Sequence, residues 1–174
     1  VEKGDADPGK NLTVYQSLVK GEKLELITQK LTELGATKLA PFYSEFCQVK
    51  PNTTRIDRLE KISIEALKQC GRSKLLEISP IVNFVDMIKE LKNYEEVIFA
   101  YEGAKTPLDL ERLKTKKNVA IIIGSEGGFS EEEATLLTAL NNVVKISVGR
   151  RILRTETVCI ALSTLILFGL GELK

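Results

Sequence analysis

Hydrophobic residues recur along the chain with two alternating spacings, one typical of helices and one of buried strands. Residues 21–35 carry Leu24, Ile27, Leu31 and Leu34 at helical spacing and end at a glycine. Helices are also predicted at residues 55–71, 83–92, 108–114 and 130–140, and from near Arg154 onward. Short apolar runs predict strands at residues 37–44, 95–103, 118–124 and 143–149.

The alternation of strands and helices predicts an α/β fold, with a mostly parallel sheet covered by helices on both faces. Ligands bind in such folds at the carboxyl ends of the strands. Three turns that contain glycine fall at these ends, "AYEGA", "GSEGG" and "SVGRR", and we expect them to form one site. Residues 1–15 are interpreted as a linker or the remnant of a trimmed segment, and residues 16–174 as the folded domain.

The composition limits which reactions and partners are possible. A length of 174 residues fits one globular domain. The net charge of +1 gives no overall positive field that would attract nucleic acid. The chain has no histidine, which excludes histidine-based triads and argues against a metal site. Three widely spaced cysteines indicate a reducing cytoplasm without a disulfide framework. The longest apolar run, residues 158–170, is too short for a membrane span and predicts a buried or interface helix.

The loop "GSEGGFSEEE" resembles a phosphate-binding loop but lacks the Gly-Lys-Ser/Thr ending of that motif. Glu126 lies among its glycines and Glu131–Glu133 follow, a charge that would repel a polyphosphate. The three later glutamates have a structural explanation, because acidic residues in a first helical turn complement the helix dipole. Ser130 and Glu133 are also in capping-box register. Glu126 has no such explanation, so we expect a cationic ligand with adenosine and no phosphate, such as S-adenosylmethionine.

A second motif, "SVGRRILRTETV", places Arg150, Arg151 and Arg154 around a strand-to-helix turn. One interpretation is a solvated arginine cluster with a helix cap. The other is that backbone groups near Gly149 hold a cofactor while an arginine faces an anionic partner, since its planar fork donates two hydrogen bonds to phosphates and base edges.

These two motifs carry a resemblance to a known family. "IGSEGGFSEEE" followed by "VGRRILRTETVCIAL" is similar to the C-terminal signature of the 16S ribosomal RNA uridine-N3 methyltransferases, of the SPOUT superfamily. "QKLTELGATKLAPFYSEFC" and "EALKQCGRS" also resemble that family, so the likeness covers residues 12–172. The resemblance implies a C-terminal deep trefoil knot, S-adenosyl-L-methionine bound by the knot loops, and a homodimer with each site near the subunit interface. The implied substrate is a uridine of 16S ribosomal RNA in the small ribosomal subunit, methylated at N3.

Carried onto this chain, the resemblance implies three groups of site residues. The cofactor-binding residues would be Ala100, Tyr101, Glu102, Gly103, Gly124, Ser125, Glu126, Gly127, Gly128, Val148, Gly149, Arg150, Arg151, Ile152 and Leu153. The residues facing the target base would be Arg154 and Glu156, and the RNA-binding residues would be Arg72, Arg151 and Arg154.

The chain departs from the family pattern at two points. Ser125 stands where the family usually has proline, which we expect to alter loop stiffness more than binding. Family members also carry an N-terminal β-barrel domain that binds RNA, and nearly all of it is missing here. We expect this departure to affect binding of RNA rather than binding of the cofactor.

Methyl transfer from a sulfonium is an in-line displacement that needs no metal, and proximity alone supplies roughly 7–11 kcal/mol. We expect Arg154 to stabilise the negative charge that develops on the base carbonyl oxygens. Glu156 has two alternatives, a general base or a partner that orients Arg154, and we favour the second. Two rival functions are a non-catalytic RNA-binding module, supported by the arginine cluster, and a nucleotide-dependent enzyme, disfavoured by the acidic loop.

Overall fold

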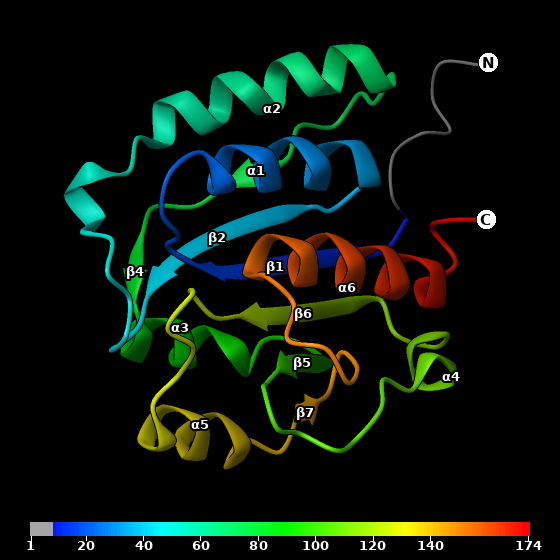
Figure 1. Cartoon of the computed structure of the whole chain (residues 1–174). Helices are drawn as coiled ribbons and strands as arrows, with labels where there is room; N and C mark the ends of the chain where they lie inside the picture. The colour runs from blue at the N-terminus through cyan, green and yellow to red at the C-terminus, as the bar shows by residue number, and fades with distance from the viewer. Residues whose placement is uncertain (1–8) are drawn as a thin grey trace.

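The computed structural model describes residues 9–174 as a three-layered α/β domain (Figure 1). The strands are β1 (Asn11–Ser17), β2 (Lys38–Tyr43), β3 (Glu77–Ile78), β4 (Val82–Asn83), β5 (Glu96–Ala100), β6 (Asn118–Ile123) and β7 (Val143–Ile146). The helices are α1 (Lys23–Leu34), α2 (Ile56–Cys70), α3 (Phe84–Leu91), α4 (Leu110–Leu113), α5 (Glu131–Thr138) and α6 (Thr155–Leu170), with a 3-10 turn η1 (Pro51–Thr53). The predicted helices and strands are confirmed, with boundaries shifted by a few residues.

The strands form one sheet in the order β3-β2-β1-β6-β5-β7, with β4 also paired to β2. Every pairing between these strands is parallel, so all of their carboxyl ends lie at one edge of the sheet. The α/β fold with a parallel sheet is therefore confirmed. Strands β6, β5 and β7 are neighbours, which places the three turns that follow them side by side.

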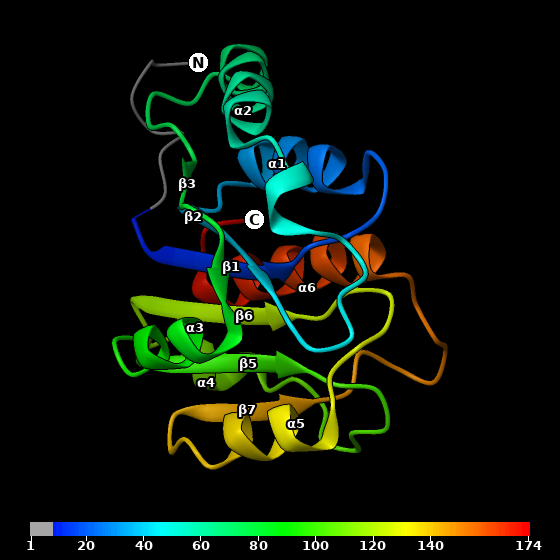
Figure 2. The same cartoon turned by 90° about the vertical axis from the view of Figure 1, so that its left-hand side faces the viewer.

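Helices cover both faces of this sheet (Figure 2). One hydrophobic cluster joins α1, α4 and α6 to the sheet, and α2 packs against α1. A second cluster joins α3 and α5 to the opposite face. In β6, Ile121 and Ile123 belong to the first cluster while Ala120 and Ile122 belong to the second. Because β6 is buried on both faces, it reads in the sequence as a continuous apolar run.

The predicted boundary at residue 15 is wrong, because it lies inside β1, a central strand between β2 and β6. The pattern hid this strand because four of its seven residues, Asn11, Thr13, Gln16 and Ser17, are polar. Thr13, Gln16 and Ser17 are nevertheless buried. The side chains of Gln16 and Ser17 make hydrogen bonds that the sequence alone does not indicate. Residues 1–8 of the predicted linker lie outside the described residues.

Between residues 9 and 174, no helix is both long enough and apolar enough to cross a membrane. The apolar run near the C-terminus forms α6, which lies alongside α1 and β1 (Figure 1). Its buried side contributes Cys159, Leu162 and Ile166 to the first core cluster. The threading of this segment into a trefoil knot stays a prediction.

Candidate cofactor and RNA site

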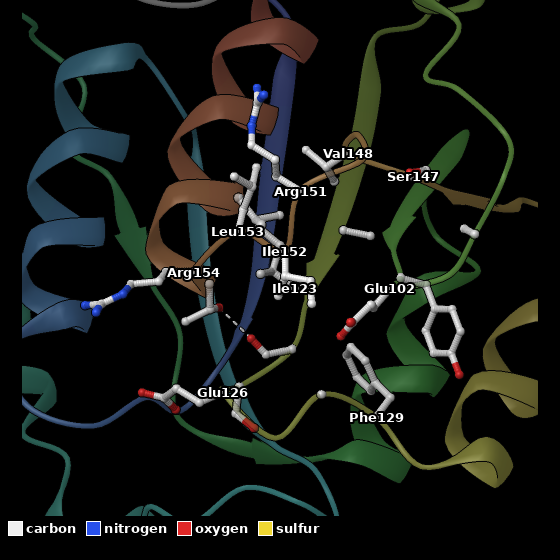
Figure 3. A pocket seen from close by; sticks show the side chains of 18 of the residues that line it. Glu102, Ile123, Glu126, Phe129, Ser147, Val148, Arg151, Ile152, Leu153 and Arg154 are labelled. Atoms are coloured by element: carbon white, nitrogen blue, oxygen red, sulfur yellow. Dashed lines mark hydrogen bonds between the residues drawn. The ribbon is translucent and has the colours of Figure 1, made fainter.

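A cavity of about 900 Å³ opens at the carboxyl ends of β5, β6 and β7 (Figure 3). Residues 100–104, 124–129 and 147–156 line it, so the turns after the three strands enclose a single space. All fifteen cofactor residues implied by the resemblance lie on its wall, as do Arg154 and Glu156. The predicted convergence of the three turns is confirmed. The volume is within the range of roughly 300–1,000 Å³ that is typical of small-molecule sites.

Seven lining residues were not among the site residues that the resemblance implied, although some of them lie within the quoted motifs. They are Lys23, Ala104, Ile123, Phe129, Ser147, Thr155 and Val158. All of them except Lys23 lie within or next to the motifs that predicted the site. Lys23 is different, because it comes from the first turn of α1, far from the three motifs, and no sequence signal connects it to them.

Glycines in the turn after β6 permit a close approach between two backbone segments. A Cβ atom on Gly127 would lie 2.7 Å from the carbonyl oxygen of Phe46, a separation that side chains essentially never adopt. Gly128 has a φ of +69°, and its N–H donates to the Ser125 carbonyl at 3.0 Å, which closes the turn. The glycines of this loop therefore serve its tight geometry and its packing against the chain that follows β2.

Glu126 is not the uncompensated negative charge that the sequence suggested. Its Oε1 accepts a hydrogen bond from Lys23 Nζ at 2.8 Å and another from the Lys20 backbone N–H at 3.1 Å. Partial burial by itself would raise the pKa of Glu126, but these hydrogen bonds, led by that from Lys23, hold the pKa below its ordinary value. The expectation that Glu126 is an uncompensated charge is therefore wrong, because Lys23 of α1 neutralises it.

The charges around the cavity are mixed. Its basic side chains are Lys23, Arg150, Arg151 and Arg154, and its acidic side chains are Glu102, Glu126 and Glu156. This balance does not by itself exclude a phosphate-bearing ligand, so the charge argument against a nucleotide is weaker than the sequence suggested. The missing Lys-Ser/Thr of a phosphate loop remains the stronger argument.

The acidic start of α5 has the structural role expected of it. Ser130 Oγ accepts from the Glu133 N–H at 3.2 Å, and Glu133 Oε2 accepts from the Ser130 N–H at 3.1 Å, so the predicted capping box is confirmed. Glu133 Oε1 also accepts from the Glu45 N–H at 2.8 Å. Glu131 and Glu132 are exposed in the first helical turn. None of the three lines the cavity.

The arginine cluster lies at the opening of the cavity. Arg150, Arg151 and Arg154 are exposed, and none of the ion pairs formed within residues 9–174 involves them. Arg154 is the N-cap residue of α6, but its side chain makes no capping hydrogen bond. Figure 3 shows Arg151 and Arg154 extending in different directions from the segment that carries them. The cap interpretation therefore does not account for these side chains.

Glu156 lines the same cavity but forms no ion pair with Arg154 among the described residues. Its Oε2 atom is buried, and no hydrogen-bond partner for it is present among the described residues. The predicted orientation of Arg154 by Glu156 is not observed, since no ion pair joins them in the described part of the chain. A buried acceptor without a donor, on the wall of a cavity, is the arrangement expected where a ligand supplies the donor.

Arg72 does not belong to this site, and its predicted position on an RNA-facing surface is wrong. Only 6% of the residue is exposed. Its guanidinium donates to the carbonyl oxygens of Thr32 at 2.7 Å and Ala36 at 3.1 Å. Thr32 lies in the last turn of α1, which leaves carbonyl acceptors without helical partners, and Ala36 follows the C-cap Gly35. Arg72 thus satisfies the C-terminus of a helix, a role that the tertiary structure alone reveals.

Fold and site together define the class of protein: an α/β domain with a cavity of small-molecule size at the carboxyl edge of a parallel sheet, with arginines at the opening. The fold is that of the SPOUT methyltransferases. Residues 7–167 match the RNA methyltransferase domain family, and the chain belongs to that family.

Named relatives agree with this assignment. The chain is 34% identical over 152 residues to ribosomal RNA small subunit methyltransferase E of Rickettsia conorii, an alignment that covers 86% of this chain. It spans only 61% of that relative's length.

Two solved structures are also similar. A methyltransferase of Legionella pneumophila in complex with bound SAM has a TM-score of 0.82 at 31% identity, over 93% of this chain and 67% of that chain. Ribosomal RNA small subunit methyltransferase E of Neisseria gonorrhoeae, bound to S-adenosyl methionine, has a TM-score of 0.80 at 28% identity. The match covers 91% of this chain and 66% of that chain.

Proposed function

We propose that this domain transfers a methyl group from S-adenosylmethionine to N3 of a uridine in 16S ribosomal RNA. The observation that carries this proposal is the convergence of the turns after β5, β6 and β7 on one cavity with arginines at its opening. The names of the similar proteins support methyl transfer to ribosomal RNA of the small subunit, and the family resemblance of the sequence motifs supports uridine N3 as the acceptor. Three free cysteines fit a reducing, cytoplasmic location.

The residues on the cavity wall fit the proposed cofactor. Residues 100–103, 124–128 and 148–153 would hold it, with Gly127 and Gly128 allowing the backbone to lie close. Buried Glu156 Oε2 offers an acceptor without a protein donor among the described residues, and Glu102 adds negative charge beside a cationic ligand. When bound, S-adenosylmethionine supplies the methyl group on a sulfonium centre.

Arg154 and Glu156 are proposed to act on the uracil. The neutral N3 imide is a poor nucleophile, so its proton must leave and negative charge must spread to the flanking carbonyl oxygens. Arg154, exposed at the cavity opening and without an ion-pair partner in the described chain, is positioned to donate hydrogen bonds to those oxygens. Because no ion pair joins Glu156 to Arg154, an orienting role for Glu156 is less favoured. Its buried Oε2 instead favours a role as an acceptor, either of the N3 proton or of a ligand N–H group.

The proposed partner besides RNA is a second copy of this chain. Thr157, Ala161, Thr164, Leu165 and Phe168 form one face of α6 that is exposed or half-buried. Leu165 and Phe168 leave 44% and 57% of their surfaces exposed, so this face is apolar as well as uncovered. Val158 adjoins it and lines the cavity, so a copy that covered this face would also border the site.

The proposal is tested by two measurements on the same protein. Calorimetry with S-adenosylhomocysteine should show micromolar binding, and transfer of a labelled methyl group to small ribosomal subunits with unmodified 16S ribosomal RNA should place the label at uridine N3. Binding of RNA without S-adenosylhomocysteine would instead support a non-catalytic RNA-binding module. Competition by ATP but not by S-adenosylhomocysteine would support a nucleotide-dependent enzyme.

A further inference from the structure

A fully buried glutamine lies beneath the cavity, at the carboxyl end of the central strand β1. Gln16 is 0% exposed and stands between Pro41 of β2 and Ile123 of β6 in the sheet register. A central strand of a parallel sheet is usually apolar at such positions. The buried amide therefore calls for an explanation in terms of what it contacts.

The side-chain nitrogen of Gln16 lies near three acceptors. Its Nε2 atom is 2.9 Å from the Ser17 carbonyl oxygen, 3.2 Å from Thr155 Oγ1 and 3.3 Å from the Gly124 carbonyl oxygen. Two N–H groups thus serve three acceptors from three different segments. Ser17 ends β1, Gly124 begins the turn after β6, and Thr155 is the first residue of α6.

The hydroxyl of Thr155 determines how the glutamine amide is oriented. Thr155 Oγ1 donates its hydrogen to the Gly124 carbonyl at 2.6 Å, so it can only accept from Gln16. The amide nitrogen must then face Thr155. Gln16 Oε1 is left buried, with no hydrogen-bond partner among residues 9–174. An unpaired buried carbonyl destabilises the fold by about 1–3 kcal/mol. The Gln16 amide N–H group is therefore kept at Thr155 in spite of a cost in stability.

This network is the polar connection between the start of α6 and the sheet. Among residues 150–156 of the described structure, Thr155 is the only one whose side chain makes hydrogen bonds. The turn after β6 is fastened elsewhere as well, by the Lys23–Glu126 ion pair and by the close approach of Phe46 to Gly127. Loss of Gln16 should therefore release α6 more than it releases the turn.

We propose that Gln16 is a positioning residue that holds Thr155, and with it the adjacent Arg154, in place for methyl transfer. Gln16 does not line the cavity, so it acts through Thr155. The expected effect on methyl transfer rests on the proposed function. The restraint on α6 can be measured even in a protein that transfers no methyl group.

The test compares Gln16→Leu and Thr155→Val with wild type. Each should lower the rate of methyl transfer at saturating cofactor and RNA by about tenfold or more, while the Kd for S-adenosylhomocysteine changes by less than about threefold. Thr155→Ser keeps the hydroxyl and should retain most of the rate. The double variant should be hardly slower than the slower single variant, because both changes break one network.

Thr32→Val is a matched control. Thr32 is also 0% exposed, and its hydroxyl donates to Thr28 O and lies 3.1 Å from Ser63 Oγ, between α1 and α2. This variant should lose stability without losing rate. The proposal is overturned if Gln16→Leu is folded and transfers methyl groups at the wild-type rate, or slows no more than Thr32→Val. It is also overturned if cofactor binding falls in parallel with the rate, since Gln16 would then support the turn after β6 instead.

A second readout separates this inference from the proposed function. Cys159, buried one turn after Thr155, should react faster with iodoacetamide in Gln16→Leu than in wild type or Thr32→Val, as measured by mass spectrometry of its peptide. If wild type transfers no methyl group, the proposed function fails while this measurement still tests the restraint. Unchanged labelling of Cys159 would overturn the inference.

Discussion

Lys23 and Glu126 lie 103 residues apart in the sequence, and their side chains form an ion pair of 2.8 Å at the cavity wall. The pair joins the first turn of α1 to the turn after β6. It also sets the local charge near the ligand, because each partner cancels the other. Removing either partner should therefore change how the cavity distinguishes a cationic ligand from a neutral one.

The first prediction concerns this discrimination. Lys23→Met should raise affinity for cationic S-adenosylmethionine relative to neutral S-adenosylhomocysteine, and Glu126→Gln should lower it. Each ratio should change about two- to fourfold, as expected for a unit charge roughly 10 Å away in a solvated site. Calorimetry with both ligands measures the ratio. Lys30→Met, which breaks the Lys30–Glu33 pair on the same helix but away from the cavity, should leave it unchanged. Identical ratios in all four proteins would contradict the prediction.

The same pair should make stability depend on pH. Because the folded state lowers the pKa of Glu126 below its ordinary 4.5, the stabilisation is present above that pH and is lost as pH falls through the lowered value. The difference in thermal midpoint between wild type and Glu126→Gln should thus be present at pH 7 and vanish in acid. Thermal unfolding of both proteins between pH 3 and 7 checks this. A difference that grew as pH fell would show the opposite linkage.

Arg154 should matter for transfer and little for cofactor binding. Arg154→Ala should slow methylation by roughly 10²–10³, the cost of removing one donor to a developing oxyanion, with the Kd for S-adenosylhomocysteine nearly unchanged. Arg154→Lys should be intermediate because it keeps the charge but loses the planar fork. Single-turnover kinetics and calorimetry separate the two quantities. The control is Arg55→Ala, an exposed arginine outside the cavity, and normal turnover in Arg154→Ala would refute the role.

The three cysteines should differ in reactivity. Burial raises the pKa of the Cys159 thiol to about 12, whereas Cys47 and Cys70 are only half-buried. At pH 8 the native protein should therefore be alkylated at Cys47 and Cys70 well before Cys159, and all three should react alike in denaturant. Peptide mass mapping over time gives the order. Rapid labelling of Cys159 in the native state would indicate that α6 opens readily.

The exposed face of α6 should control association. Phe168→Glu or Leu165→Glu places a charge on the proposed subunit interface and should convert a dimer to a monomer in sedimentation velocity. The control is Val85→Glu, which changes a residue of α3 with 59% of its surface exposed. Dissociation by the control, or dimers that persist in both α6 variants, would place the interface elsewhere.

The sequence by itself determined most elements and the location of the site. Helical spacing of apolar residues predicted α1 and α2, and the continuous run of β6 predicted a strand buried on both faces. Because all strands are parallel, the turns after β5, β6 and β7 had to meet at one edge. Local pattern and strand direction were sufficient for these conclusions.

Tertiary structure decided what depends on contacts between distant residues. β1 was hidden because the partners of its buried polar side chains lie on other segments, as with Gln16 and Thr155. Arg72 looked like an exposed cation until its acceptors at the end of α1 were known, and Glu126 looked uncompensated until Lys23 was placed beside it. A polar side chain is exposed or buried, charged or neutralised, according to its neighbours in space, and spacing along the chain does not specify them.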